Sequence, residues 1–181
     1  MVYGRAGLGR SGRIDLSSLN GTNGLILSGE QAGDWSSFSV AGAGDVNGDK
    51  IADFIIGAYY ANASAGKSYV VFGGLGLETS GNFSLSSLNG SNGFVLTGEN
   101  INDDSGFAVS GASDVNGDEI ADLLIGAREA NSDVGKSYVV FGRVGLGSTG
   151  SIALSSLNGT NGFVVNGEQA GDRSGSSVAS A

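Results

Sequence analysis

The sequence predicts an all-β protein made of tandem four-stranded antiparallel β-meanders, with about 2.6 units of 69 residues in a chain of 181 residues. Three observations lead to this fold class. Long segments recur at a constant spacing, the apolar runs are short and rich in β-branched and aromatic residues, and Asn-Gly pairs typical of turns separate them. No segment has the apolar period of about 3.6 residues that an amphipathic helix requires.

The repeat is visible in motifs that return without insertion or deletion. KSYVVFG begins at Lys67 and at Lys136, and DVNGD begins at Asp45 and at Asp114, so both motifs recur after 69 residues. SSLNG occurs three times at the same spacing. We therefore expect a single array of repeats over residues 1–181, and we expect it to be a segment of a longer repeat protein. The units are approximately 5–73, 74–142 and a partial third unit, 143–181.

Four runs in each unit have the composition of strands. In the first unit they are FSVAGA at 38–43, IADFIIGA at 51–58, KSYVVFG at 67–73, and GLILSG at 24–29, whose copy is GFVLTG at 93–98. Four-stranded sheets repeated at a few tens of residues are typical of β-propeller blades. A ring needs about four to eight blades, so an open stacked solenoid of the same sheets is the alternative architecture.

Composition excludes several classes of function. The chain has no cysteine and no histidine, which removes thiolate chemistry, imidazole acid–base catalysis and every metal site built on these residues. The formal net charge of −9 repels the phosphates of nucleic acids and anionic membrane surfaces. No apolar run approaches the roughly 20 residues of a membrane-spanning helix. We therefore expect no nucleic-acid partner, no direct membrane insertion and no enzymatic activity.

The strongest chemical signal is the pattern D-x-N-x-D-x-x-x-D, which occurs once in each of the first two units. Alternate residues in a tight turn direct their side chains toward one centre, and the following carbonyl and the last aspartate can complete a cage of oxygen atoms. The expected metal ligands are Asp45, Asn47, Asp49, Ile51 (through its carbonyl) and Asp53 in the first copy, and Asp114, Asn116, Asp118, Ile120 (carbonyl) and Asp122 in the second copy.

Calcium is the metal that this ligand set favours. All of the ligands are hard oxygens, whereas zinc and copper sites use nitrogen or sulfur, and Mg²⁺ demands a stricter octahedral geometry. An EF-hand does not fit, because its twelfth position would be Ile56 or Ile125 rather than a carboxylate. We therefore expect two Ca²⁺ ions, one for each complete repeat. The alternative interpretation is a solvated acidic turn with no metal.

These residues resemble a known repeat family. The pattern F-x-V-A-G-A-G-D-V-N-G-D-x-x-A-D-x-x-I-G-A, followed by G-K-S-Y-V-V-F-G, is similar to the FG-GAP repeat of integrin α-subunit propellers, in the version found in bacterial integrin-like proteins. The resemblance spans essentially the whole chain. It implies four-stranded blades and a structural Ca²⁺ held by the aspartate-rich loop.

The sequence thus predicts a non-enzymatic, calcium-binding structural or adhesion module of a large extracellular or cell-surface protein. Its expected partners are neighbouring repeats of the same chain or other copies of it, and protein or glycan ligands. A ligand- or carbohydrate-recognition domain is the alternative, and an accessory domain of a hydrolase is a further one. Trp35, Tyr59 and Tyr60 break the repeat and are candidates for recognition, although packing against a neighbouring unit explains them equally well.

Overall fold

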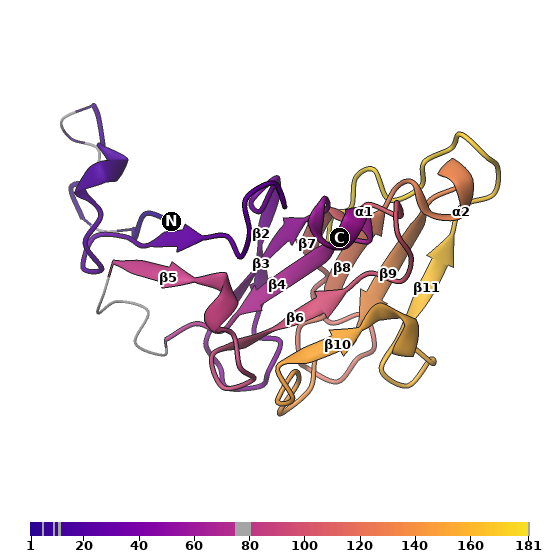
Figure 1. Cartoon of the computed structure of the whole chain (residues 1–181). Coiled ribbons are helices and arrows are strands. Elements are labelled where there is room, and N and C mark those ends of the chain that lie inside the picture. Colours follow the sequence, from indigo (N-terminus) through magenta and orange to yellow (C-terminus); the bar gives the residue numbers. More distant parts are fainter. Residues whose placement is uncertain (5, 9, 11, 75–80, 181) are drawn as a thin grey trace.

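A computed structural model describes the chain except for residues 5, 9, 11, 75–80 and 181 (Figure 1). Eleven strands are formed by the described residues: β1 (Ile26–Ser28), β2 (Ser39–Gly44), β3 (Asp53–Ala58), β4 (Lys67–Val71), β5 (Asn82–Ser84), β6 (Gly93–Thr97), β7 (Ser105–Gly111), β8 (Leu123–Ala127), β9 (Lys136–Val140), β10 (Ser151–Ala153) and β11 (Gly162–Asn166). The helical elements are short: η1 (Leu16–Ser18), η2 (Leu85–Ser87), η3 (Leu154–Ser156), α1 (Ala61–Ser64) and α2 (Ala130–Asp133).

Two large sheets contain the predicted meanders. In the first sheet, β2, β3, β4 and β6 are antiparallel neighbours, and in the second sheet β7, β8, β9 and β11 repeat the same order. The all-β repeat fold is therefore confirmed. Each sheet takes its fourth strand from the next sequence unit, because β6 follows residue 73 and β11 follows residue 142.

Two short strands form parallel pairs that the sequence did not predict: β10 is the fifth strand of the first large sheet, and β5 forms a separate two-stranded sheet with β1. β10 pairs with β6 and places Ile152 opposite Leu96, and β5 pairs with β1 in the same way, with Phe83 opposite Leu27. Each short strand therefore links its own unit to the outer strand of the preceding one. The β1–β5 pair lies at one end of the molecule, beside the first large sheet (Figure 1).

The two large sheets pack face to face through an apolar core. Ile55, Val70 and Phe94 of the first sheet are fully buried against Leu123 and Ile125 of the second. The other side of the first sheet is partly covered by Leu27, Phe83 and Leu85 from the β1–β5 region. A closed barrel is not formed by the described residues.

Glycine allows the two sheets to approach closely. A Cβ atom on Gly57 would lie 2.0 Å from the carbonyl oxygen of Gly106, and one on Gly126 would lie 2.0 Å from that of Gly175. These positions are equivalent in the repeat, so the backbone contact recurs from one unit to the next. Within the part of the chain that the structure describes, we find no helix of the length and apolar character needed to cross a bilayer.

Candidate functional site

The two aspartate-rich segments form equivalent loops at the same edge of the two sheets. Residues 45–52 connect β2 to β3, and residues 112–122 connect β7 to β8. The loops are neighbours, because the amide of Ala121 donates a 3.0 Å hydrogen bond to the carbonyl oxygen of Asp45. The predicted strand 51–58 begins at Asp53 because Ile51 and Ala52 belong to the loop.

Asp45 organises the first loop. One of its carboxylate oxygens accepts hydrogen bonds from the amides of Gly48 (2.7 Å) and Asp49 (3.0 Å), and the other accepts one from Lys50 (2.8 Å). Asn47 accepts a further bond from the amide of Asp49 (2.9 Å). The chain therefore wraps around the side chains of Asp45 and Asn47.

The reversal of the loop needs left-handed backbone at two positions. Gly48 has φ of 79°, as the Asn-Gly pair predicts, and Lys50 has φ of 69°. The second loop has the same geometry at Gly117 (82°) and Glu119 (70°). A left-handed lysine or glutamate is uncommon, and sequence analysis did not identify it.

Asp53 anchors the end of the first loop. Its side chain is only 3% exposed, and its two oxygens accept the amides of Val46 (3.0 Å) and Gly73 (2.9 Å). Burial raises the pKa of this carboxyl to about 6, against the lowering effect of the two backbone hydrogen bonds. Asp53 thus joins the loop to the residues that follow β4.

The second loop repeats these contacts. Asp114 accepts the amides of Gly117, Asp118 and Glu119, and these bonds, that of Glu119 foremost, lower the pKa of its carboxyl. Asp122 is fully buried and accepts the amides of Val115 and Gly142, both at 2.8 Å. Burial raises the pKa of Asp122, as it does for Asp53.

The donor set of each loop suits calcium, although the carboxylates do not converge. Among the described residues, no three acidic side chains lie close enough together to form a metal centre. Each expected carboxylate ligand instead accepts backbone amides, including that of Ile51 on Asp49 (2.8 Å) and that of Ile120 on Asp118 (2.9 Å). A carboxylate oxygen has a second lone pair, so these bonds orient the side chains without using up their capacity as ligands.

At the opposite edge of the sheets, the turns that follow β3 and β8 hold two clusters of side chains, one aromatic and one charged. We call them the aromatic corner and the charged corner. Trp35 packs on Tyr59 and Tyr60 in the first unit, with ring centroids 6.0 Å and 5.5 Å away, and its side chain is 58% exposed. In the second unit, the equivalent positions hold Asp104, Arg128 and Glu129. The corner therefore changes from an aromatic stack to an ion-paired cluster between one unit and the next.

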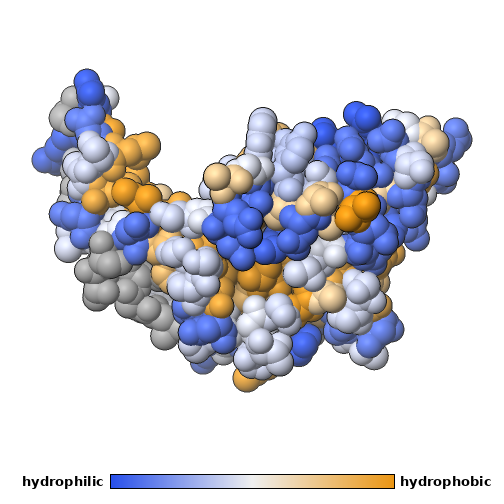
Figure 2. Space-filling model, in the orientation of Figure 1, coloured by the Kyte–Doolittle hydropathy of each residue, from blue (hydrophilic) through white to orange (hydrophobic). Residues whose placement is uncertain are grey.

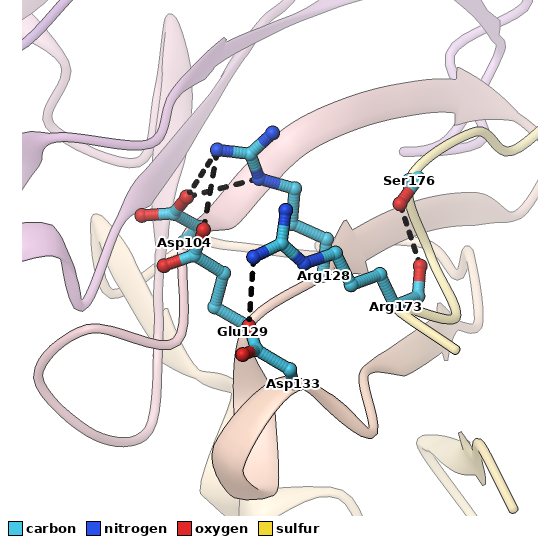
Figure 3. Close-up of polar contacts among 6 residues, drawn as sticks. All are labelled: Asp104, Arg128, Glu129, Asp133, Arg173 and Ser176. Atoms are coloured by element: carbon cyan, nitrogen blue, oxygen red, sulfur yellow. Dashed lines mark hydrogen bonds and ion pairs between the residues drawn. The ribbon is translucent and has the colours of Figure 1, made fainter. Parts of the chain in front are cut away.

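Arg128 is the centre of the charged corner (Figure 3). Its guanidinium pairs with Asp104 at 3.1 Å and with Glu129 at 3.3 Å, and lies 3.7 Å from the centroid of the Phe107 ring. The side chain of Asp104 is only 6% exposed, and desolvation raises the pKa of its carboxyl despite the hydrogen bond from Arg128. Arg173 pairs with Asp133 nearby, at 3.3 Å.

An ion pair within the first unit recurs at the equivalent place of the second unit, at this same edge. Glu30 accepts hydrogen bonds from the ammonium of Lys67 (2.7 Å) and the hydroxyl of Tyr69 (2.8 Å), and these bonds lower the pKa of its carboxyl. Glu99 accepts a bond from Lys136 at 2.6 Å in the same position of the next unit. Glu30 and Glu99 are 69 residues apart and therefore equivalent in the repeat, but the sequence does not indicate their lysine partners.

The fold and the loops together define a class of protein: tandem antiparallel sheets, each with an aspartate-rich loop between its first two strands. Residues 38–71, which span β2 to β4 and include the first loop, match the model of the FG-GAP repeat family. The chain is also 34% identical over 108 residues to integrin alpha-X of Homo sapiens. Residues 38–71 thus match one FG-GAP repeat, and the chain is similar to integrin-like repeats.

The similarity to integrin alpha-X covers only part of each of the two proteins. The alignment covers 57% of this chain and 8% of the human protein. The likeness is to repeats found in an integrin α-subunit, and neither comparison indicates a catalytic family.

Proposed function

We propose that the chain is a non-enzymatic, calcium-binding adhesion module of an extracellular or cell-surface protein, in which Ca²⁺ stabilises the loops between strands. The observation that carries this proposal is the duplication of one acidic loop at equivalent places in two packed sheets. The similarity of the repeats to those of an integrin α-subunit supports the adhesive role and the location.

The ligands would come from Asp45, Asn47, Asp49, the carbonyl of Ile51, and Asp53, and from the equivalent residues of the second loop. Calcium would supply positive charge where several carboxylates lie close in sequence, and it would join the loop to the strand that follows. Because the unfolded chain lacks this arrangement, the binding free energy adds to the free energy of unfolding.

The test is thermal unfolding of the whole chain in EGTA and in excess Ca²⁺. At 100 times the dissociation constant, each site would add about 2.7 kcal/mol to the free energy of unfolding. Asp49→Ala combined with Asp118→Ala should remove the response to calcium, because both side chains belong to the ligand set and neither is buried. Lys50→Ala with Glu119→Ala is the matched control, since these loop residues are not expected ligands. An unchanged response in the Asp49/Asp118 variant would overturn the ligand assignment.

A second candidate function is recognition of a protein or glycan ligand at the aromatic corner. The observation that favours it is the exposure of Trp35, Tyr60 and Phe38, at 58%, 49% and 49%. They lie beside the partly buried Phe107. Trp35→Ala and Tyr60→Ala should then abolish binding on a glycan array or in a ligand pull-down, while the calcium response of unfolding stays unchanged.

A further inference from the structure

The two aspartate-rich loops are joined directly by a backbone hydrogen bond. The amide of Ala121 donates to the carbonyl oxygen of Asp45 at 3.0 Å. Asp45 is the first expected ligand of its loop, and Ala121 lies between Ile120 and Asp122, the last two expected ligands of the other loop. An ordered ligand set in one loop therefore fixes a backbone group that the other loop needs.

A second route joins the two anchoring carboxylates through backbone groups. Asp53 accepts the amide of Val46 at 3.0 Å, and the carbonyl oxygen of Val46 accepts the amide of Arg143 at 3.1 Å. Gly142, the residue before Arg143, donates its amide to Asp122 at 2.8 Å. Val46 and the two carboxylates are buried, so these bonds are shielded from water. The position of Asp53 is thus tied to that of Asp122.

Side chains of the second unit also lie against glycines of the first loop. A Cβ atom on Gly44 would lie 2.6 Å from the Cβ atom of Ala121. A Cβ atom on Gly48 would lie 2.9 Å from a methyl group of Val144 and 3.5 Å from one of Ile120. Gly48 is the left-handed glycine at which the first loop reverses. A movement of the second loop is therefore transmitted to the reversal of the first.

We propose that the two loops bind Ca²⁺ cooperatively, so that an ion in either loop raises the affinity of the other. This inference rests on the proposed function, because it takes both loops as calcium sites. Binding in one loop orders the residues that carry the bonds between the loops. The second ion then has fewer residues to order, and it binds more tightly for that reason.

Charge repulsion between two bound ions acts against this coupling. Residues 114–119 of the second loop, and Asp49 and Lys50 of the first, are exposed to solvent. Most of the surface at this edge of the sheets, opposite α1 and α2, is hydrophilic or near neutral in hydropathy (Figure 2). Salt screens exposed charges beyond about 8 Å at physiological ionic strength, but it does not screen buried backbone bonds in the same way. We therefore expect the ordering effect to prevail and to persist as salt is added.

The test is a Ca²⁺ titration of the whole chain followed by NMR, in which the amide signals of Gly48 and Gly117 report each loop separately. Asp118→Ala removes a ligand of the second loop and leaves those of the first, and Asp49→Ala does the reverse. The midpoint of the Gly48 signal should move to higher calcium in Asp118→Ala, and that of Gly117 should do so in Asp49→Ala. Fitting the three titrations to one linked model should give a coupling factor of about 5 or more.

A matched pair of proline variants tests the bridge itself while both ligand sets stay in place. Ala121→Pro removes the amide that bonds Asp45. Ala52→Pro places proline at the equivalent position of the first loop, where, among the described residues, the amide makes no hydrogen bond to the second loop. Each proline follows an expected carbonyl ligand, so both variants disturb their own loop alike. The coupling factor should fall in Ala121→Pro and stay unchanged in Ala52→Pro.

The possible outcomes separate this inference from the calcium site itself. If the midpoints of Gly48 and Gly117 do not change in the single-loop variants, the loops are independent and the proposal fails, although calcium binding stands. Tighter binding in those variants would reverse the sign of the coupling and equally refute it. Equal coupling factors in the two proline variants would exclude the bridge from Ala121 to Asp45. If neither signal responds to calcium, the proposed function fails and this inference fails with it.

Discussion

Asp53 and Gly73 lie 20 residues apart in sequence, yet the amide of Gly73 donates a 2.9 Å hydrogen bond to the Asp53 carboxylate. The same carboxylate accepts the amide of Val46 from within the loop. Asp53 therefore ties the acidic loop, the start of β3 and the end of the β4 hairpin together. Asp122 and Gly142 repeat this relationship in the second sheet.

Asp53→Ala should destabilise the chain even without metal. The substitution leaves two amides without their acceptor, and each buried unsatisfied group costs about 1–3 kcal/mol. We expect a loss of that order in the free energy of unfolding, measured by urea denaturation in EGTA. Asp49→Ala is the control, because its exposed side chain orders only the loop itself. Equal losses in the two variants would show that Asp53 has no special anchoring role.

The raised pKa of Asp53 predicts an unusual pH dependence of the metal-free chain. A carboxyl with a pKa of about 6 when folded, and an ordinary value when unfolded, holds its proton more tightly in the folded state. Its contribution favours folding most at low pH and is lost as the pH rises through about 6. Relative to Asp53→Asn, the original chain in EGTA should gain on the order of 1 kcal/mol between pH 7 and pH 5.

In excess Ca²⁺, the free energy of unfolding should instead be lower at pH 5 than at pH 7, because the metal binds the ionised carboxylate. The apparent affinity for Ca²⁺, measured by calorimetry, should fall as the pH drops below about 6, with proton uptake by the buffer on binding. A pH-independent affinity between pH 7 and pH 5 would exclude Asp53 from the ligand set.

The sequence was sufficient to predict the meander and the position of the loops, because both depend on local signals. Apolar alternation and Asn-Gly turns mark β2 to β4, and the spacing of the aspartates marks the loop. The parallel strands β5 and β10 have only three residues each, too few to carry a period. The pairing of Lys67 with Glu30 joins residues 37 positions apart and depends on how the segment after β1 folds back on β4, which a repeat in one dimension does not specify.

The spacing of the acidic residues also does not reveal which of them anchors the loop to the sheet and which only orders the loop. The pattern places Asp45 and Asp53 in one ligand set, whereas the structure shows that Asp45 bonds only backbone inside its loop and Asp53 reaches Gly73. That difference arises from burial, since Asp53 lies under the sheet edge and Asp45 lies nearer to solvent.

Gly57→Ala should disturb the packing between the sheets. A Cβ atom at this position would lie 2.0 Å from the carbonyl oxygen of Gly106, so backbone of one sheet must move. Overpacking of this kind costs about 1–3 kcal/mol, and we expect a corresponding fall in the urea midpoint. Gly42→Ala is a matched control on the adjacent strand, because a Cβ atom there meets nothing within 4 Å. Equal stability of the two variants would mean that the sheets are not in close contact at Gly57.

Arg128→Ala should destabilise the chain by leaving the Asp104 carboxylate unpaired. This carboxylate is nearly buried, and the loss of one partner from a buried ion pair costs about 3–5 kcal/mol. Because Arg128 is 25% exposed, we expect the free energy of unfolding to fall by an amount at the lower end of that range or below it. Arg128→Ala also removes the guanidinium from the face of Phe107.

A double-mutant cycle with Asp104→Asn separates the two contributions of Arg128. If the ion pair dominates, Arg128→Ala should cost much less in the Asp104→Asn background, because no unpaired charge is left behind. If the contact with Phe107 dominates, Arg128→Ala should cost the same in both backgrounds, and Phe107→Leu should reduce its effect instead. We expect the first result, because Asp104 is more buried than Arg128 and its pKa is already raised by desolvation. Urea denaturation of the four chains at pH 7 measures the coupling directly.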